Sequence, residues 1–177
     1  MKTPRILATF FLLFIFHHYG LAQEAKFEIK LMGGYLNQLE PPKNFSIPFQ
    51  NGGFLGIGLF NESKLGGSNF EIHLNYLSKR PEGQIINYYE PFSLKGQANY
   101  LVRIFPIGES HLFLGPGLAI HQPLNSIGDY NGPSFGANGK IMAPLIISGV
   151  VFYLTADVDY LTIPGFWRNS IGINFRL

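Results

Sequence analysis

Alternation of apolar and polar residues dominates the chain after Glu24. In the segment 149–160, one face is apolar and consists of Val150, Phe152, Leu154, Ala156, Val158 and Tyr160. The opposite face includes Asp157 and Asp159. A period of two residues is typical of a β-strand, in which successive side chains point to opposite faces. The sequence therefore predicts an all-β protein.

Eight segments with this alternation are separated by the turn-forming residues Gly, Pro, Asn and Ser. The expected strands are 27–36, 52–60, 69–78, 92–105, 111–121, 133–143, 149–160 and 168–177. Most are close to the roughly 9–11 residues that a tilted strand needs to cross a bilayer. We expect one domain over residues 24–177, folded as an eight-stranded antiparallel up-and-down transmembrane β-barrel.

The connections between these strands alternate in length. The generally longer set is 37–51, 79–91, 122–132 and 161–167, and the shorter set is 61–68, 106–110 and 144–148. Aromatic residues would lie near both ends: Tyr35, Tyr76, Phe92, Tyr160 and Trp167 at the end with the longer loops, and Phe27, Phe70, Phe152 and Phe175 at the other. Long outer loops, short periplasmic turns and two aromatic girdles are typical of outer-membrane barrels.

Most charges in the expected strands lie on the polar face. This predicted lumen charge network consists of Glu28, Lys30, Glu71, His73, Lys95, Arg103, Lys140, Asp157, Asp159 and Arg176. Both signs are present, and an eight-stranded barrel is just wide enough for side chains to fill its interior. Alternation alone also allows a soluble periplasmic β-barrel, whose apolar face would point inward around a small apolar ligand.

The N-terminal segment has the pattern of a signal peptide over residues 1–23. Lys2 and Arg5 precede an apolar run over 6–16, and the small residues Gly20 and Ala22 follow. His17 and His18 end the run before the roughly 20 residues that a spanning helix needs. We expect cleavage near Ala22 or Gln23 and export across the inner membrane.

The composition supports a barrel with an apolar exterior. Hydrophobic residues make up 46% of the chain and charged residues only 14%, against about 25% charged in soluble domains. The chain has no cysteine, which excludes disulfides, thiol catalysis and cysteine-ligated zinc. Without Lys2 and Arg5, the 13 basic residues become 11, equal to the 11 acidic ones. Because no basic surplus remains, we expect no nucleic-acid partner.

Five segments carry a resemblance to a known family: LAQ at 21–23, FLGPGLAI at 113–120, FGANGKI at 135–141, VFYLTADVDY at 151–160 and SIGINFRL at 170–177. Together they resemble the small outer-membrane β-barrel proteins of the OmpA/OmpX type, especially those of Bacteroidetes. The resemblance implies an outer-membrane protein, a monomer whose partners are outer-membrane lipid and, during biogenesis, the barrel-assembly machinery. The last segment is similar to the C-terminal assembly signal, although Leu177 stands in place of a terminal aromatic residue.

The sequence predicts no catalytic, cofactor-binding or metal-ligating residue. Some barrels of this class are lipid A deacylases with a His-x-Ser pair, but Asn75 stands two residues after His73. His111 and His121 are about 33 Å apart along a strand and share no metal. Asp157 and Asp159 could form an acidic or cation site, but pairing with Lys140, Arg176 or Lys30 is the favoured interpretation.

The most promising binding segment is the loop 79–91, which contains Lys79, Arg80, Tyr88 and Tyr89. These residues form either a surface binding site or an aromatic girdle with a charged rim. We therefore expect a non-enzymatic outer-membrane protein with a structural or surface recognition role. The alternatives are a membrane-embedded hydrolase of lipid A or phospholipid, and the soluble periplasmic barrel. A wide porin is not expected, because wide channels come with 16–18 strands.

Overall fold

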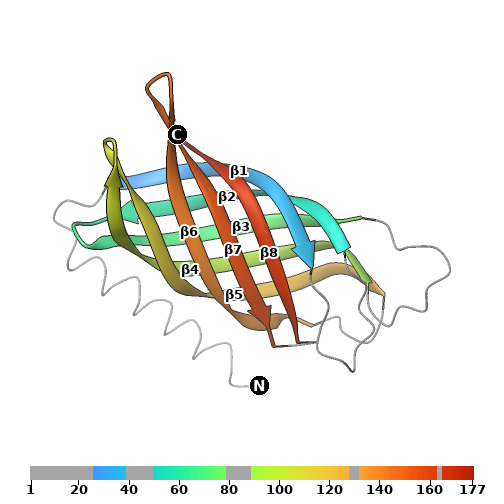
Figure 1. Cartoon of the computed structure of the whole chain (residues 1–177). Coiled ribbons are helices and arrows are strands. Elements are labelled where there is room, and N and C mark those ends of the chain that lie inside the picture. Colours follow the sequence, from blue (N-terminus) through green and yellow to red (C-terminus); the bar gives the residue numbers. More distant parts are fainter. Residues whose placement is uncertain (1–25, 39–49, 79–88, 128–131, 163–164) are drawn as a thin grey trace.

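The computed structural model of the chain describes residues 26–38, 50–78, 89–127, 132–162 and 165–177 (Figure 1). Eight strands run in chain order around a closed barrel, and each is antiparallel to its neighbours. They are β1 (Lys26–Gln38), β2 (Gln50–Glu62), β3 (Gly66–Leu77), β4 (Tyr89–Ile107), β5 (Ser110–Ile127), β6 (Ser134–Ile147), β7 (Val150–Leu161) and β8 (Phe166–Arg176). Pairing of β8 with β1 closes the barrel. The predicted eight-stranded up-and-down architecture is confirmed. Within the described ranges, no helix is long and apolar enough to cross a membrane.

The boundaries of β4, β5 and β6 differ most from the expected ones, and β6 continues to Ile147, past the expected end at 143. The expected strands 92–105 and 111–121 are both extended in the structure. Pro91 and Pro123 indicated turns in the sequence, because proline lacks the N–H that a sheet ladder needs. The structure places both inside strands, where the register between β4 and β5 shifts on either side of Phe92. Such irregularities accommodate proline without ending the strand.

The two ends of the barrel differ in their connections. At one end the hairpins close through residues 63–65, 108–109 and 148–149, and we call this the short-turn end. The opposite, long-loop end receives the connections 39–49, 78–88, 128–133 and 162–165. Ser148 and Gly149 have φ angles of 51° and 78°. Positive φ at both central residues is what a two-residue type I′ hairpin turn requires.

Side chains on the outer wall are apolar, and those facing the interior are mostly polar. On β7, Leu154 and Val158 are 42% and 44% exposed, whereas Asp157 and Asp159 are buried. The same phase holds on β3 and β8, as the alternation predicted. This distribution is the reverse of a soluble barrel, whose apolar side chains fill the core.

An apolar plug fills the interior at the short-turn end. It consists of Phe60, Leu101, Phe113, Met142 and Tyr153, all fully buried. The rings of Phe60 and Phe113 meet edge to face with centroids 5.2 Å apart, and Tyr153 shares a 2.7 Å hydrogen bond between hydroxyl groups with Ser110. Tyr153 shares its inward face with Thr155 and Asp157, whereas Phe60 and Phe113 share theirs mostly with glycines. Neither pattern marks an apolar interior, so alternation gave no indication of the plug.

Candidate functional site

A cluster of buried charges lies in the middle of the barrel, between the apolar plug and the long-loop end. We call Lys30, Glu71, Lys140 and Asp157 the central cluster. Lys140 Nζ is 2.9 Å from Glu71 Oε2 and 3.1 Å from both carboxylate oxygens of Asp157. Lys30 Nζ is 3.6 Å from Glu71 Oε1 and donates a hydrogen bond to Asn69. The two ammonium groups thus face two carboxylates, which offsets part of the desolvation cost of each buried charge.

The central cluster connects strands from different parts of the barrel. Lys30 and Glu71 come from β1 and β3, whereas Lys140 and Asp157 are direct partners across β6 and β7. Gln97 of β4 donates hydrogen bonds of 2.5 Å to Glu71 and 3.1 Å to Asp157. The interior is therefore crossed by hydrogen bonds between opposite walls. Lys30 Nζ also lies 4.9 Å from the centre of the Phe60 ring, which joins the cluster to the apolar plug.

A second ion pair and a histidine extend the network toward the long-loop end. Lys95 Nζ is 2.6 Å from Asp159 Oδ2, and Asn138 donates to the other oxygen of Asp159. His73 Nε2 is 3.0 Å from Glu71 Oε2. The His73 ring also stacks on Phe54 at 4.8 Å. Each of these side chains is held by at least one partner, so the interior is packed and hydrogen-bonded.

A third group of polar and charged side chains lies nearer the long-loop end, and we call it the upper cluster: Gln38, Glu90, His121 and Arg168. Arg168 forms an ion pair with Glu90 and donates to Gln38 Oε1 at 3.0 Å. His121 Nε2 is 2.8 Å from the Glu90 carboxylate, and Arg168 Nη1 is 2.9 Å from His121 Nδ1. All four side chains are buried. The interior thus has three layers: the apolar plug, the central charges and the upper cluster.

The residues of the predicted lumen charge network occupy several environments. Seven of them are buried in the interior: Lys30, Glu71, His73, Lys95, Lys140, Asp157 and Asp159. Glu28 is half-buried. Arg103 is half-buried on β4 near the short-turn end, where it pairs with Glu62 at 2.7 Å. The side chain of Arg176 lies outside the described part of the chain. Asp157 and Asp159 pair with Lys140 and Lys95, respectively, and Lys95 was not among the partners anticipated for them.

Sequence reasoning missed the upper cluster. Glu90 lies within the predicted loop 79–91, and Arg168 is the first residue of the predicted strand 168–177. The signal that could have found Arg168 is its phase, since it lies two residues before Ser170 on the polar face of β8. Glu90 and Arg168 are 78 residues apart in the chain, and no local pattern indicates their pairing.

The candidate binding loop falls largely outside the described residues. Lys79, Arg80 and Tyr88 are not described, and of Tyr89 only the backbone is placed, as the first residue of β4. In the described ranges, no group of His, Asp and Glu side chains is arranged to hold a metal ion. His73 and His121 each contact a carboxylate.

Comparison with known proteins supplies a structural relative. No family model matches the sequence, and no curated protein matches it. Among solved structures, the crystal structure of Neisserial surface protein A is similar, with a TM-score of 0.64 and 10% sequence identity. The match covers 88% of this chain and 99% of that one. At this identity the likeness is one of fold, and the shared fold is that of an outer-membrane barrel.

Proposed function

We propose that this protein is a non-enzymatic β-barrel of the outer membrane, with a structural or surface recognition role carried by the loops of its long-loop end. The observation that carries this proposal is the apolar outer wall around a polar, ion-paired interior. Leu55, Ile72 and Ile171, on three different strands, expose 71%, 60% and 63% of their surface. A soluble monomer rarely exposes a continuous apolar surface of this extent.

Aromatic contacts on the outer wall support a membrane position. Tyr76 packs against Phe92 at 5.3 Å and Tyr160 against Trp167 at 4.9 Å, both near the long-loop end. At the short-turn end, Phe152 packs edge to face against Phe175 at 4.9 Å. Aromatic residues at two levels match the girdles that membrane barrels place at both interfaces. A closed barrel also leaves no unpaired strand edge in lipid.

The filled interior supports a structural rather than a transport role. The plug and the two charge clusters together cross the interior with side chains from most of the strands. An eight-stranded barrel has an interior just wide enough for such packing. The protein therefore offers its partners the loops and the outer wall, and not a wide aqueous channel.

The remaining features of the proposal concern biogenesis and relatives. Residues 1–23 act as a cleaved signal peptide, and the barrel-assembly machinery inserts residues 24–177 as a monomer. The protein belongs with the OmpA/OmpX type of Bacteroidetes, and Lys79, Arg80, Tyr88 and Tyr89 contribute to surface contacts. The likeness in fold to Neisserial surface protein A supports the outer-membrane barrel in this proposal.

Heat-modifiability tests the proposal. A closed membrane barrel in an outer-membrane fraction migrates differently on a detergent gel before and after boiling, and it stays in the membrane during carbonate extraction. Release by carbonate would contradict the membrane location and favour the soluble periplasmic barrel. Release of fatty acid from lipid A or phospholipid by the purified barrel would contradict the non-enzymatic role.

A further inference from the structure

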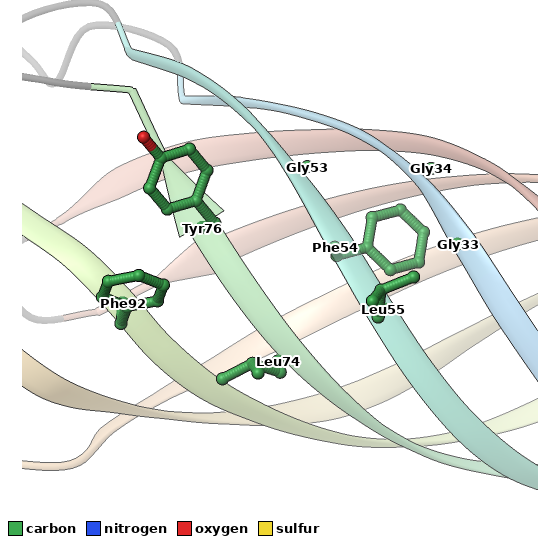
Figure 2. Close-up of a pocket in the computed structure, with 8 residues that line it drawn as sticks. All are labelled: Gly33, Gly34, Gly53, Phe54, Leu55, Leu74, Tyr76 and Phe92. Atoms are coloured by element: carbon green, nitrogen blue, oxygen red, sulfur yellow. The ribbon is translucent and has the colours of Figure 1, made fainter.

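A groove of about 420 Å³ opens on the outer wall, across β1 to β4 near the long-loop end. Its lining is apolar and consists of Gly33, Gly34, Gly53, Phe54, Leu55, Leu74, Tyr76 and Phe92 (Figure 2). Leu55, Leu74, Tyr76 and Phe92 expose between 42% and 71% of their surface. The groove is therefore part of the wall that faces lipid in the proposed membrane position.

Two glycines at outward positions form the groove. The strand register places Gly53 between Tyr35 and Tyr76 in one row across the wall. In the next row, Gly33 lies between Ile173 and Leu55. Every non-glycine residue in these two rows has an exposed, bulky side chain. The missing side chains at Gly33 and Gly53 thus leave a hollow between flanking apolar groups.

The floor of the groove is rigid. Phe54 points inward from β2, is 5% exposed and stacks on the buried ring of His73. A Cβ atom added at Gly34 would lie 2.8 Å from the Phe54 ring and 2.1 Å from the Ile171 carbonyl oxygen. Gly34 is therefore required for close packing of β1 onto β8 and onto this ring. A packed floor of this kind keeps the hollow open instead of letting the wall collapse into it.

We propose that this groove binds one acyl chain of a diacyl phospholipid from the surrounding membrane. The inference rests on the proposed membrane location, because the groove is continuous with the exposed apolar wall that would contact lipid. A chain lying in the groove touches the wall at its floor and on both flanks, whereas a chain elsewhere touches one side only. More contacts at van der Waals distance hold that chain longer than its neighbours. In Figure 2 the Tyr76 hydroxyl points toward the long-loop end, the direction in which a polar headgroup would lie.

The test fills the groove and measures lipid retention. Gly53→Leu would place a side chain between Tyr35 and Tyr76, where its Cβ would be 3.2 Å from the Gly34 carbonyl oxygen. Gly33→Leu is the second variant, and its nearest contact would be the flexible end of Leu55 at 3.1 Å. Gly139→Leu on β6 is the matched control, because a Cβ there would meet no atom within 4 Å on an exposed stretch of the wall.

The wild type and the three variants are refolded in dimyristoylphosphatidylcholine vesicles, transferred to detergent and weighed by native mass spectrometry. We expect the wild type and Gly139→Leu to retain one lipid, and the groove variants to retain it roughly tenfold less. If Gly53→Leu does not fold, Gly33→Leu decides.

Equal lipid retention by all folded variants would overturn the groove proposal. Native mass spectra that show barrel dimers, and no bound lipid, would overturn it too. The heat-modifiability of the same samples separates this outcome from failure of the proposed function. A wild-type chain that does not fold in vesicles contradicts the membrane location itself.

Discussion

At the scale of single residues, the interior depends on matched charges. Lys140 contacts Glu71 and Asp157, and all three side chains are at most 2% exposed. Removal of one partner from such a group leaves the other charges buried and uncompensated, which costs about 3–5 kcal/mol. The pair of Arg103 with Glu62 is only half-buried and stays in contact with solvent, so it should contribute far less, about 0–1 kcal/mol.

We therefore expect Lys140→Met to lower the free energy of unfolding by about 3–5 kcal/mol, because Glu71 and Asp157 lose their shared cation. The measurement is a urea titration of the refolded barrel in detergent or vesicles. Arg103→Met, at the half-buried pair near the short-turn end, is the control and should change the free energy by about 0–1 kcal/mol. If the two substitutions changed the free energy of unfolding equally, the result would contradict the buried ion pairs of the central cluster.

The outer wall gives a second prediction at this scale. Leu154 lies in the middle of β7 and is 42% exposed to the outside. If lipid surrounds it, Leu154→Arg should destabilise the barrel by about 2–4 kcal/mol, whereas Val150→Arg at the short-turn end should cost only about 0–1 kcal/mol. Refolding titrations in vesicles measure both variants. If Leu154→Arg and Val150→Arg destabilise the barrel equally, the result argues against a bilayer around β7.

At the scale of elements, β8 has the most exacting position. It pairs with β7 on one side and with β1 on the other, and it therefore closes the barrel. Deletion of residues 170–177 would leave β1 and β7 with unpaired edges. Each unpaired backbone group in hydrocarbon costs several kcal/mol.

We expect the 170–177 deletion to abolish membrane insertion. Phe175→Ala should reduce insertion, because it removes the ring contact with Phe152 and apolar surface that is 50% exposed on the outer wall. Deletion of residues 82–87 is the control and should leave insertion intact, because shortening a loop changes its closure entropy little. Membrane yield and heat-modifiability report all three. The topology would be contradicted if the 170–177 deletion still folded in the membrane and the 82–87 deletion did not.

Sequence reasoning succeeded at this scale where the evidence is local. The phase of β7 and β8 follows from alternation, because one apolar and one polar face are visible within a few residues. It failed at the ends of β4 and β5, where Pro91 and Pro123 suggested turns although a sheet irregularity accommodates them. It also failed for the plug, because Phe60 and Phe113 lie on glycine-rich faces and Tyr153 lies on a face with Asp157 and Asp159. Their burial depends on contacts between strands that no single segment shows.

At the scale of the whole molecule, the interior is closed twice. The apolar plug fills the short-turn end, and the central and upper clusters cross the interior above it. The first closure relies on packed rings and the second on ion pairs between walls. Loss of the apolar plug should therefore leave the charge clusters in place, and loss of the charge clusters should leave the plug in place.

This arrangement predicts that the wild-type barrel conducts no large ion current. Phe113→Ala shortens a fully buried plug side chain that contacts the ring of Phe60, and the cavity it leaves should cost about 3–5 kcal/mol of stability. It should nevertheless stay closed to solutes, because Lys140, Glu71 and Asp157 still span the interior. Planar-bilayer recordings at neutral pH, paired with a urea titration, measure the two effects on the same samples. A large, stable, ohmic conductance in the wild type would show that the charged layers do not close the interior. The same conductance in Phe113→Ala alone would show that the plug, and not the ion pairs, forms the barrier.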